Sequence, residues 1–508
     1  MSLLIGVTGG LSNALISANL PYLRGSLGLD TPEIAWLPVA YAITNACGGG
    51  ILFKYRQQFG VRSFALIFIT LHLLLISAHL FVQSLASAIL VRAADGLAAT
   101  ALTTLTLFYM MQALPQTMRL RALALGIAIP QFAIPLARLI PIDIMAFNEW
   151  RGLYLMEFGL SALSLAGVLV VRLPSGIRWS AFEWLDLITM PFYVAAVACL
   201  GSAIGLGPYL WWTDRDWIGW CLAASIALFT IVFVIEWGRG QPLIDVKWLS
   251  GIDFLRFAIV ITITRVVLSE QATGSIGFLR LFGLVNEDFY DLSVLLLVAA
   301  VAGAITAALL ITPDRITHLV MWALGLVAIA SYFDSFSSDL TRARQFYATQ
   351  AVIAFATTLF IGPALIFGIK RVVAQGAQKL SSFVILFAIT QSLGSLGGNA
   401  TVLSFQLMAE RSYSARLVSQ VTGINPLVGA RISATASAYS PIIADPSLQT
   451  AEAAATLAQE TTLQSNILAY DDVFRLIALL AAGTSAFLAC LIVGRRLAAF
   501  KVERSSHE

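Results

Sequence analysis

Residues 292–312 read LSVLLLVAAVAGAITAALLIT, a stretch without a single charged side chain. A helix needs about 20 apolar residues to cross the apolar core of a bilayer. Stretches of this length and character follow one another along nearly all of the 508 residues. Backbone groups in lipid must form their hydrogen bonds within the protein, which favours helices. The sequence therefore predicts an all-α polytopic membrane protein with about 14 transmembrane helices.

The composition supports the same fold class. Hydrophobic residues make up 58% of the chain and charged residues 12%, whereas soluble domains average about 25% charged residues. The four cysteines lie within apolar stretches, so we expect free thiols rather than a disulfide or zinc framework. The expected spans are 2–22, 34–53, 63–83, 85–113, 121–142, 153–173, 184–206, 217–237, 255–279, 291–312, 316–334, 344–369, 381–408 and 470–494.

Charges in the short gaps between spans set the expected orientation. Every second gap carries lysine or arginine, as in 54–62 and 370–379, and the intervening gaps carry acids, as in 214–216 and 287–291. The positive-inside rule then places the basic gaps and both termini in the cytoplasm. The first apolar stretch begins at Met1 without a basic leader, so we expect a retained span rather than a cleaved signal peptide.

One external segment, 410–468, is much longer than the others and is rich in Ser, Thr, Ala and Gln. Within it, 450–465 has the Ala, Leu, Glu and Gln composition of a surface helix. Two interpretations stay open for this segment, a mobile connector and a docking element for a partner.

Charged residues inside the expected spans are the first candidates for function, because an ionisable group at the bilayer centre costs about 3 kcal/mol or more. Arg92 and Asp95 lie three residues apart on one helix face, close enough to interact. Burial favours a protonated carboxyl and a nearby guanidinium favours the ionised form, so a conformational change can move a proton at Asp95. A static pair that stabilises the span is the alternative.

Other charges within spans give weaker candidates. Glu270 lies near the middle of its span and is a second candidate proton site, and Arg265 is expected to meet another helix. Glu157 lies a few residues inside its span, so it is either a proton site or a group in water. Arg138 is expected to contact an anionic substrate or to pair with Glu157 or Asp143.

Uncharged polar residues concentrate in the first, second, fourth and fifth spans, which supports a polar central cavity. Hydrogen bonding between helices is the alternative for each of them. Asp186 and Glu236 lie near cytoplasmic span ends and are expected to be solvated or capping groups. The candidate substrate-binding residues are Asn13, Tyr41, Asn45, Gln131, Arg138 and Arg265.

The sequence gives little support for metal, nucleotide or enzyme chemistry. His72 and His79 lie seven residues apart on one helix face without an acid or cysteine at ligand spacing, so no metal site is expected. Walker, Rossmann, nucleophile-elbow and His-Glu-x-x-His motifs are absent from the sequence. We therefore expect neither an ATP-driven pump nor an enzyme, no cofactor and no nucleic-acid partner, and an energy supply from the proton gradient.

Several motifs, in order along the chain, resemble those of the major facilitator superfamily. The glycine-rich and basic gap 48–62 is similar to the loop between the family's second and third spans, but lacks its acid. Arg92 and Gly96 resemble an Arg-x-x-x-Gly element of the fourth span, and Trp150-Arg151 resembles the start of the sixth. The resemblance implies two six-helix bundles around a midplane site and a role for Arg92 in proton coupling.

Two further stretches resemble the fourteen-span drug/proton antiporters, and in particular EmrB-type multidrug efflux pumps. They are QPLIDVKWL at 241–249 and SLGSLG at 392–397. The resemblance implies a bundle at 1–178, two extra helices and a linker at 179–250, and a second bundle at 251–508. It also implies proton-coupled efflux of amphiphilic small molecules across the bacterial inner membrane, with a periplasmic adaptor and an outer-membrane channel as partners.

Two departures from that family keep other functions open. Its Gly-Pro-x-x-Gly-Gly signature in span five aligns with ARLIPI at 137–142, and its acid in span one aligns with Ser12. The first alternative is a proton-coupled importer or facilitator of an organic acid or metal chelate. The second is a membrane receptor or assembly factor that transports nothing.

Overall fold

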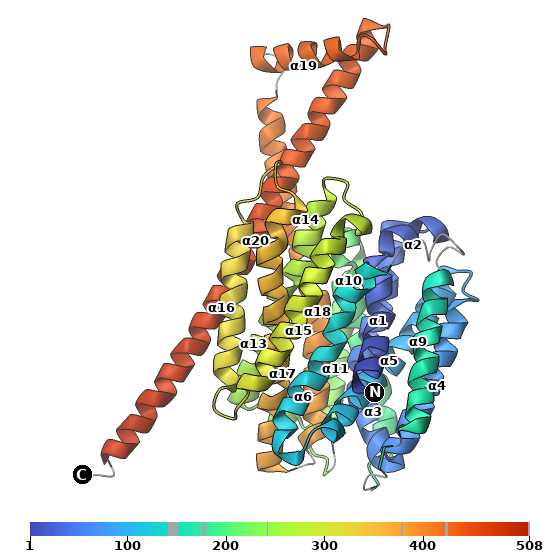
Figure 1. The fold of residues 1–508 in the computed structure, drawn as a ribbon, viewed down its shortest axis with the longest axis vertical. Coiled ribbons are helices and arrows are strands. Elements are labelled where there is room, and N and C mark those ends of the chain that lie inside the picture. Colours follow the sequence, from blue (N-terminus) through green and yellow to red (C-terminus); the bar gives the residue numbers. More distant parts are fainter. Residues whose placement is uncertain are drawn as a thin grey trace.

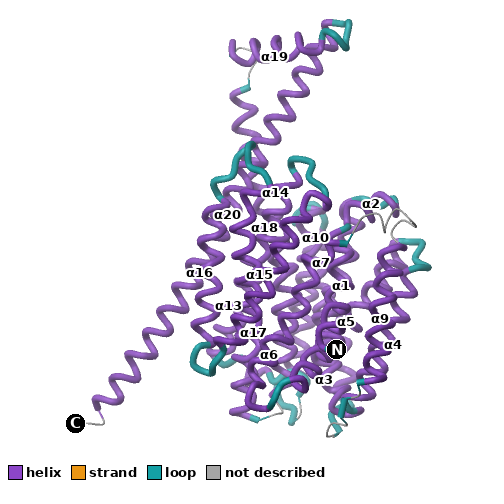
Figure 2. Tube along the Cα trace, viewed as in Figure 1, coloured by secondary structure: helices purple, strands orange, loops and turns teal. Residues whose placement is uncertain are grey.

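The computed structural model describes residues 1–140, 151–171, 173–174, 178, 180–240, 242–376, 379–421 and 425–505. Every regular element in these residues is a helix, as Figure 2 shows. The fold is therefore all-α, as predicted.

In the residues that the structure describes, the first half of the chain forms a helical bundle (Figure 1). The first span is bent by 67° between α1 and α2, and the fifth is divided by Pro130 into α6, a 3-10 turn and α7. The elements are α1 (Ser2–Ala18), α2 (Leu20–Leu27), α3 (Thr31–Phe59), α4 (Val61–His79), α5 (Leu85–Ala113), α6 (Arg119–Ala128), α7 (Ala133–Leu139) and α9 (Arg151–Val170).

Two long helices link this bundle to the second half. They are α10 (Asp186–Leu210) and α11 (Asp216–Glu236), followed by the short α12 (Val246–Leu249). The second half comprises α13 (Ile252–Ser269), a π-helical turn (Glu270–Ser275), α14 (Ile276–Arg280), α15 (Tyr290–Leu310), α16 (Ile316–Asp334), α17 (Tyr347–Gln375), α18 (Leu380–Gln420), α19 (Pro426–Tyr439) and α20 (Pro446–Ser505).

The number of spans agrees closely with the prediction. Among the described residues, 12 helices are long and apolar enough to cross a membrane, or 13 with the bent α1–α2 pair. The other predicted span, 255–279, is the segment from α13 through the π-helical turn to α14. The α-helix of this span is interrupted where Glu270 begins the π-helical turn. The span also carries Arg265, so it combines charged residues with an irregular backbone.

Local sequence explains several helix ends. Asp30 accepts a hydrogen bond from the Glu33 amide, and Glu33 accepts one from the Asp30 amide, so α3 begins with a capping box. Gly28 ends α2 in the left-handed conformation at φ 64°.

A similar close packing of two helices on a glycine is found in each half. In the first, a Cβ atom on Gly96 of α5 would lie 2.3 Å from the backbone oxygen of Tyr41 of α3. In the second, a Cβ on Gly303 of α15 would lie 2.3 Å from the backbone oxygen of Phe355 of α17. Only glycine lets these backbones approach so closely, as at other small-residue contacts in membranes.

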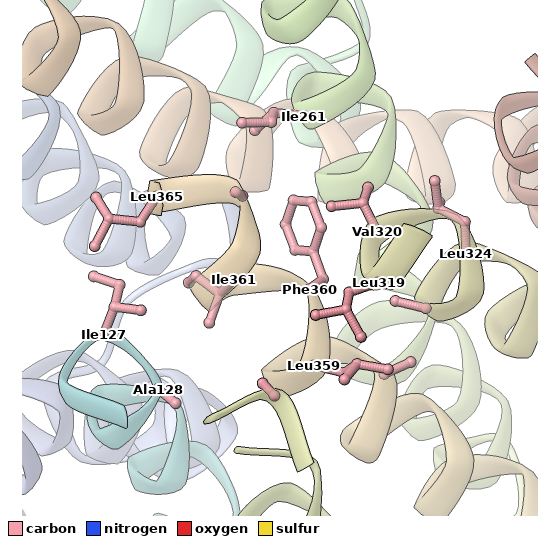
Figure 3. Packing of buried hydrophobic residues seen from close by; sticks show 14 of the residues in the cluster. Ile127, Ala128, Ile261, Leu319, Val320, Leu324, Leu359, Phe360, Ile361 and Leu365 are labelled. Atoms are coloured by element: carbon pink, nitrogen blue, oxygen red, sulfur yellow. The ribbon is translucent and has the colours of Figure 1, made fainter. Parts of the chain in front are cut away.

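The two halves meet along two seams. Helix α3 packs on α18, and α6 packs on α15 and α17. Figure 3 shows α17 between its neighbours, with Ile361 and Leu365 toward Ile127 of α6, and Phe360 toward Val320 of α16. Helix α10 packs on both α3 and α18 and so lies along the first seam, and α11 packs on α10.

The long external segment is helical rather than an extended loop. Helix α18 continues to Gln420, and α20 begins at Pro446 and continues into the bundle without a break. These two helix ends form a stalk, and α19 lies across its tip (Figure 1). We call this assembly, residues 410–468, the helical stalk, and the end of the bundle that carries it the stalk end. The helix expected at 450–465 is confirmed as part of α20.

Candidate functional site

A buried carboxylate in the first half collects three hydrogen-bond donors. Asp95 of α5 accepts from Arg92 Nη1 at 3.0 Å, lies 3.0 Å from His72 Nδ1 of α4, and accepts from the hydroxyl of Ser12 of α1. Arg92, Asp95 and His72 are each at most 1% exposed. The contact predicted between Arg92 and Asp95 is present, and the acceptor geometry is that of an ionised carboxylate.

No pattern in the sequence predicts that His72 belongs to this group. His72 and Asp95 are far apart in the sequence, on α4 and α5, and only the packing of these helices brings them together. Because His72 also carries a buried Nε2 atom without a hydrogen-bond partner, its ring can exchange a second proton.

Glu157 of α9 adds a second carboxyl to the same region. It is 1% exposed, so of the two alternatives the one that places it in water is excluded. Its Oε1 atom is buried and has no hydrogen-bond partner.

Three predicted substrate-binding residues surround the same arginine or lie close to it. Asn13 accepts a hydrogen bond from Arg92 Nη2 at 3.1 Å, and the guanidinium lies 4.7 Å from the ring centre of Tyr41. Asn45 donates to the backbone oxygen of Gly96 at 3.3 Å and accepts from Ser392 of α18 at 2.9 Å. Asn45 therefore joins the two halves.

A second buried polar group lies in the other half. Gln350 Nε2 of α17 donates to both oxygens of Glu270, at 3.0 and 3.2 Å, and to Asp334 of α16 at 3.0 Å. Ser275 also donates to Glu270. Glu270 and Ser275 are five positions apart, and the π-helical turn places them on one face of the helix. Turns of this kind are frequent at functional sites. One amide therefore bridges two carboxyl groups, and repulsion between them favours a shared proton.

The remaining predicted residues join neither cluster. Arg138 and Arg265 each have a buried Nε atom without a hydrogen-bond partner. Among the described residues no ion pair joins Arg138 to Glu157, and Asp143 lies outside them. Gln131 lies in the 3-10 turn between α6 and α7.

At the stalk end, hydrogen bonds connect the two halves. Asn286, just before α15, donates to the backbone oxygen of Ala18 at 3.1 Å and to Asn19 Oδ1 at 3.0 Å. Arg280 of α14 also donates to the Ala18 oxygen, at 3.4 Å. These contacts fall at the bend between α1 and α2.

At the opposite end, a buried ion-pair network fixes the extra helices to α3. Asp186 of α10 pairs with Lys54 at 2.7 Å and with Arg239 at 2.9 Å, and Arg239 pairs with Glu236 of α11 at 2.5 Å. Asp186 and Glu236 are 0% and 2% exposed. The expectation that they are solvated is wrong, because helix packing supplies buried cations that a sequence position near a span end does not reveal.

Comparison with known proteins gives the fold. No family model matches the chain, and no curated protein matches it in sequence. The human organic anion transporter MFSD10 (TETRAN) matches with a TM-score of 0.54 and 12% identity, over 94% of this chain and 98% of that one.

Two further transporters match equally broadly. A bacterial homologue of the human drug peptide transporters PepT1 and PepT2 gives a TM-score of 0.52 and 13% identity, over 98% of each chain. The proton:xylose symporter XylE gives 0.51 and 14%, over 94% of this chain and 93% of that one. The chain therefore shares its fold with these transporters, of which XylE is described as a member of the major facilitator superfamily.

Proposed function

We propose that this protein is a secondary active transporter that exports amphiphilic small molecules in exchange for protons across the bacterial inner membrane. The observation that carries the proposal is the buried Asp95, held ionised between Arg92 and His72 within the span region. An ionisable group at such depth is costly and is a functional candidate for that reason.

Protonation of Asp95 would neutralise the acceptor that holds three helices together. Arg92 also donates to the backbone oxygen of Ser12 at 2.9 Å, so its guanidinium connects α5 to α1. When Asp95 takes up a proton, its ion pairs with Arg92 and His72 weaken and the helices are free to shift. Rocking of the halves about a central site is the motion expected of this fold.

The carboxyl pair in the second half provides another place for a proton. Glu270 is 0% exposed, and Asp334 is 5% exposed. The Gln350 amide donates to both. Release of the shared proton would therefore leave two negatively charged carboxylates with one amide as their common donor. A transport cycle that uses both clusters moves more than one proton.

Import of an organic acid is the rival, and one observation favours it. Arg138 and Arg265 have unsatisfied buried guanidinium nitrogens, which are suited to an anionic substrate. A protein without solute flux would be a receptor or an assembly factor.

The test is proton movement in proteoliposomes on addition of a panel of dyes and organic acids. We expect proton release that Asp95→Asn abolishes and Glu270→Gln reduces. Asp339→Asn, in an exposed loop, is the matched control and should behave as the wild type. Normal coupling in both buried variants would refute the site, and proton uptake with substrate entering the vesicle would favour import.

The helical stalk supports an adaptor protein as a partner. Within it, Arg431 of α19 forms an ion pair with Glu460 of α20 at 2.5 Å. The hydroxyls of Tyr439 and Thr456 form a hydrogen bond of 3.1 Å. These two contacts hold α19 on α20. Near the tip, Leu427 of α19 is 79% exposed. Removal of 425–460 should abolish export from cells but leave transport in proteoliposomes intact. Export from cells at the wild-type rate would count against an adaptor.

A further inference from the structure

We propose that His79 carries protons between the water at the stalk end and the Asp95 cluster, through a small pocket beneath α2. This inference rests on the proposed proton coupling and assigns the route by which the proton reaches its site. It names a residue for which the sequence suggested no function.

The hydrogen bonding of His79 leaves one ring nitrogen available. His79 is the last residue of α4 and is 2% exposed. Its Nδ1 lies 2.9 Å from the backbone oxygen of Leu75. A carbonyl oxygen only accepts, so Nδ1 carries the hydrogen and Nε2 holds a free lone pair. That Nε2 atom is buried and has no hydrogen-bond partner.

The pocket joins this imidazole to the proton site. Its walls are formed by Leu23, Leu27, Leu37, His79, Val82, Ala88, Arg92 and Tyr154. All of these are apolar except His79, Arg92 and Tyr154, and the ring of Tyr154 stacks on His79 with centroids 4.4 Å apart. Arg92 is bonded to Asp95, so a proton that enters this pocket is beside the cluster.

Among the described residues, the charged and titratable groups around His79 are Arg92 and Asp95 of α5, His72 of α4, and Tyr154 of α9, whose ring stacks on it. Helices α2 and α3 line the pocket only with leucines. His79, at the end of α4, is thus the group in this pocket that offers a free imidazole lone pair.

Proton transfer through His79 needs no other reactant. A proton from water binds the lone pair of Nε2, and the same atom then releases it to water in the pocket. The hydrogen on Nδ1 stays bound to that nitrogen and donated to the Leu75 carbonyl oxygen throughout. No bond between heavy atoms forms or breaks, and the ring returns to its starting tautomer.

Helix α2 places this route under the control of the two halves. Leu23 of α2 is 1% exposed and covers the pocket. The bend that precedes α2 lies at Asn19, which accepts a hydrogen bond from Asn286 of the other half. Separation of the halves at the stalk end would break this bond and free α2, so proton access would follow the transport cycle.

The test follows protonation of Asp95 directly and needs no substrate. After a pH jump, time-resolved infrared spectroscopy of the full-length protein records the carboxyl band that Asp95→Asn lacks. We expect His79→Gln to slow the appearance of this band by about a hundredfold, the lower end of what a positioned proton-transfer group contributes, with its final amplitude unchanged. Added imidazole should restore the rate in His79→Ala.

The matched control is His318→Gln, in α16 of the other half, where Nδ1 is also buried without a partner. It should leave the rate unchanged. A wild-type rate in His79→Gln would overturn the inference and leave the proposed function standing. Loss of the amplitude without rescue by imidazole would show a structural role and also overturn it. Absence of any band sensitive to Asp95→Asn would overturn both.

Discussion

Replacement of Asp186 by leucine should be the most destabilising change at the end of the bundle opposite the stalk. Asp186 accepts hydrogen bonds from Lys54, Arg239 and the Glu183 amide, at 2.7, 2.9 and 2.9 Å, with no exposed surface. Removing one member of a buried ion pair costs about 3–5 kcal/mol, because its partner is left charged in the interior. Arg239 keeps two other carboxylates, so we expect the lower value, about 3 kcal/mol.

The assay is equilibrium unfolding in mixed detergent micelles, followed by tryptophan fluorescence. The single variant Asp186→Leu leaves the Lys54 ammonium buried without this partner. The double variant with Lys54→Met removes that ammonium. A double-mutant cycle on Asp186 and Lys54 should therefore give a coupling energy of about 1.5 kcal/mol or more. Arg431 and Glu460, which are 62% and 46% exposed, are the control pair, with coupling below about 1 kcal/mol. Equal coupling in the two pairs would refute the reasoning, because burial would then contribute nothing.

Two other predictions concern helix contacts. Asn286→Ala removes two hydrogen bonds that close the contact between the halves at the stalk end. A cysteine introduced at Tyr22 should then react faster with an impermeant maleimide. An unchanged rate would contradict the idea that these bonds keep the stalk end closed. Gly96→Leu should abolish recovery of folded protein in size-exclusion chromatography, because its Cβ atom would lie 2.3 Å from a backbone oxygen. Gly159→Leu, where the space is open, should be tolerated, and equal recovery of both would contradict the close packing.

Hydropathy was sufficient to predict the fold class because bilayer thickness imposes one length on every spanning helix. It was less informative where a segment leaves the bilayer. Residues 410–468 are polar enough to resemble a connector, yet α18 continues to Gln420, α20 begins at Pro446, and α19 packs on α20. Glu270 was visible as a charge within a span, but the π-helical turn that directs it toward Gln350 was not.

The candidate site was predictable only where its members share one helix. Arg92 and Asp95 are neighbours on one face, so their contact follows from helix geometry alone. His72 reaches Asp95 from another helix, and Asp334, the last residue of an expected span, is buried beside Gln350 of the next helix. Contacts of this kind depend on helix rotation and depth, which a single sequence does not specify.

The two buried clusters differ in the charge of the groups that surround their carboxyls. For this reason their surroundings favour opposite protonation states. In the first, Asp95 has a guanidinium and an imidazole as partners, which favour the ionised carboxylate. In the second, Glu270 and Asp334 share one neutral amide, which favours a bound proton. Under the proposed function, the first cluster is therefore an empty proton site and the second is a filled one. If both titrate during transport, loading of Asp95 and unloading of the Glu270 pair belong to the same conformational step. The double variant Asp95→Asn, Glu270→Gln should then bind substrate while it fails to move protons in either direction.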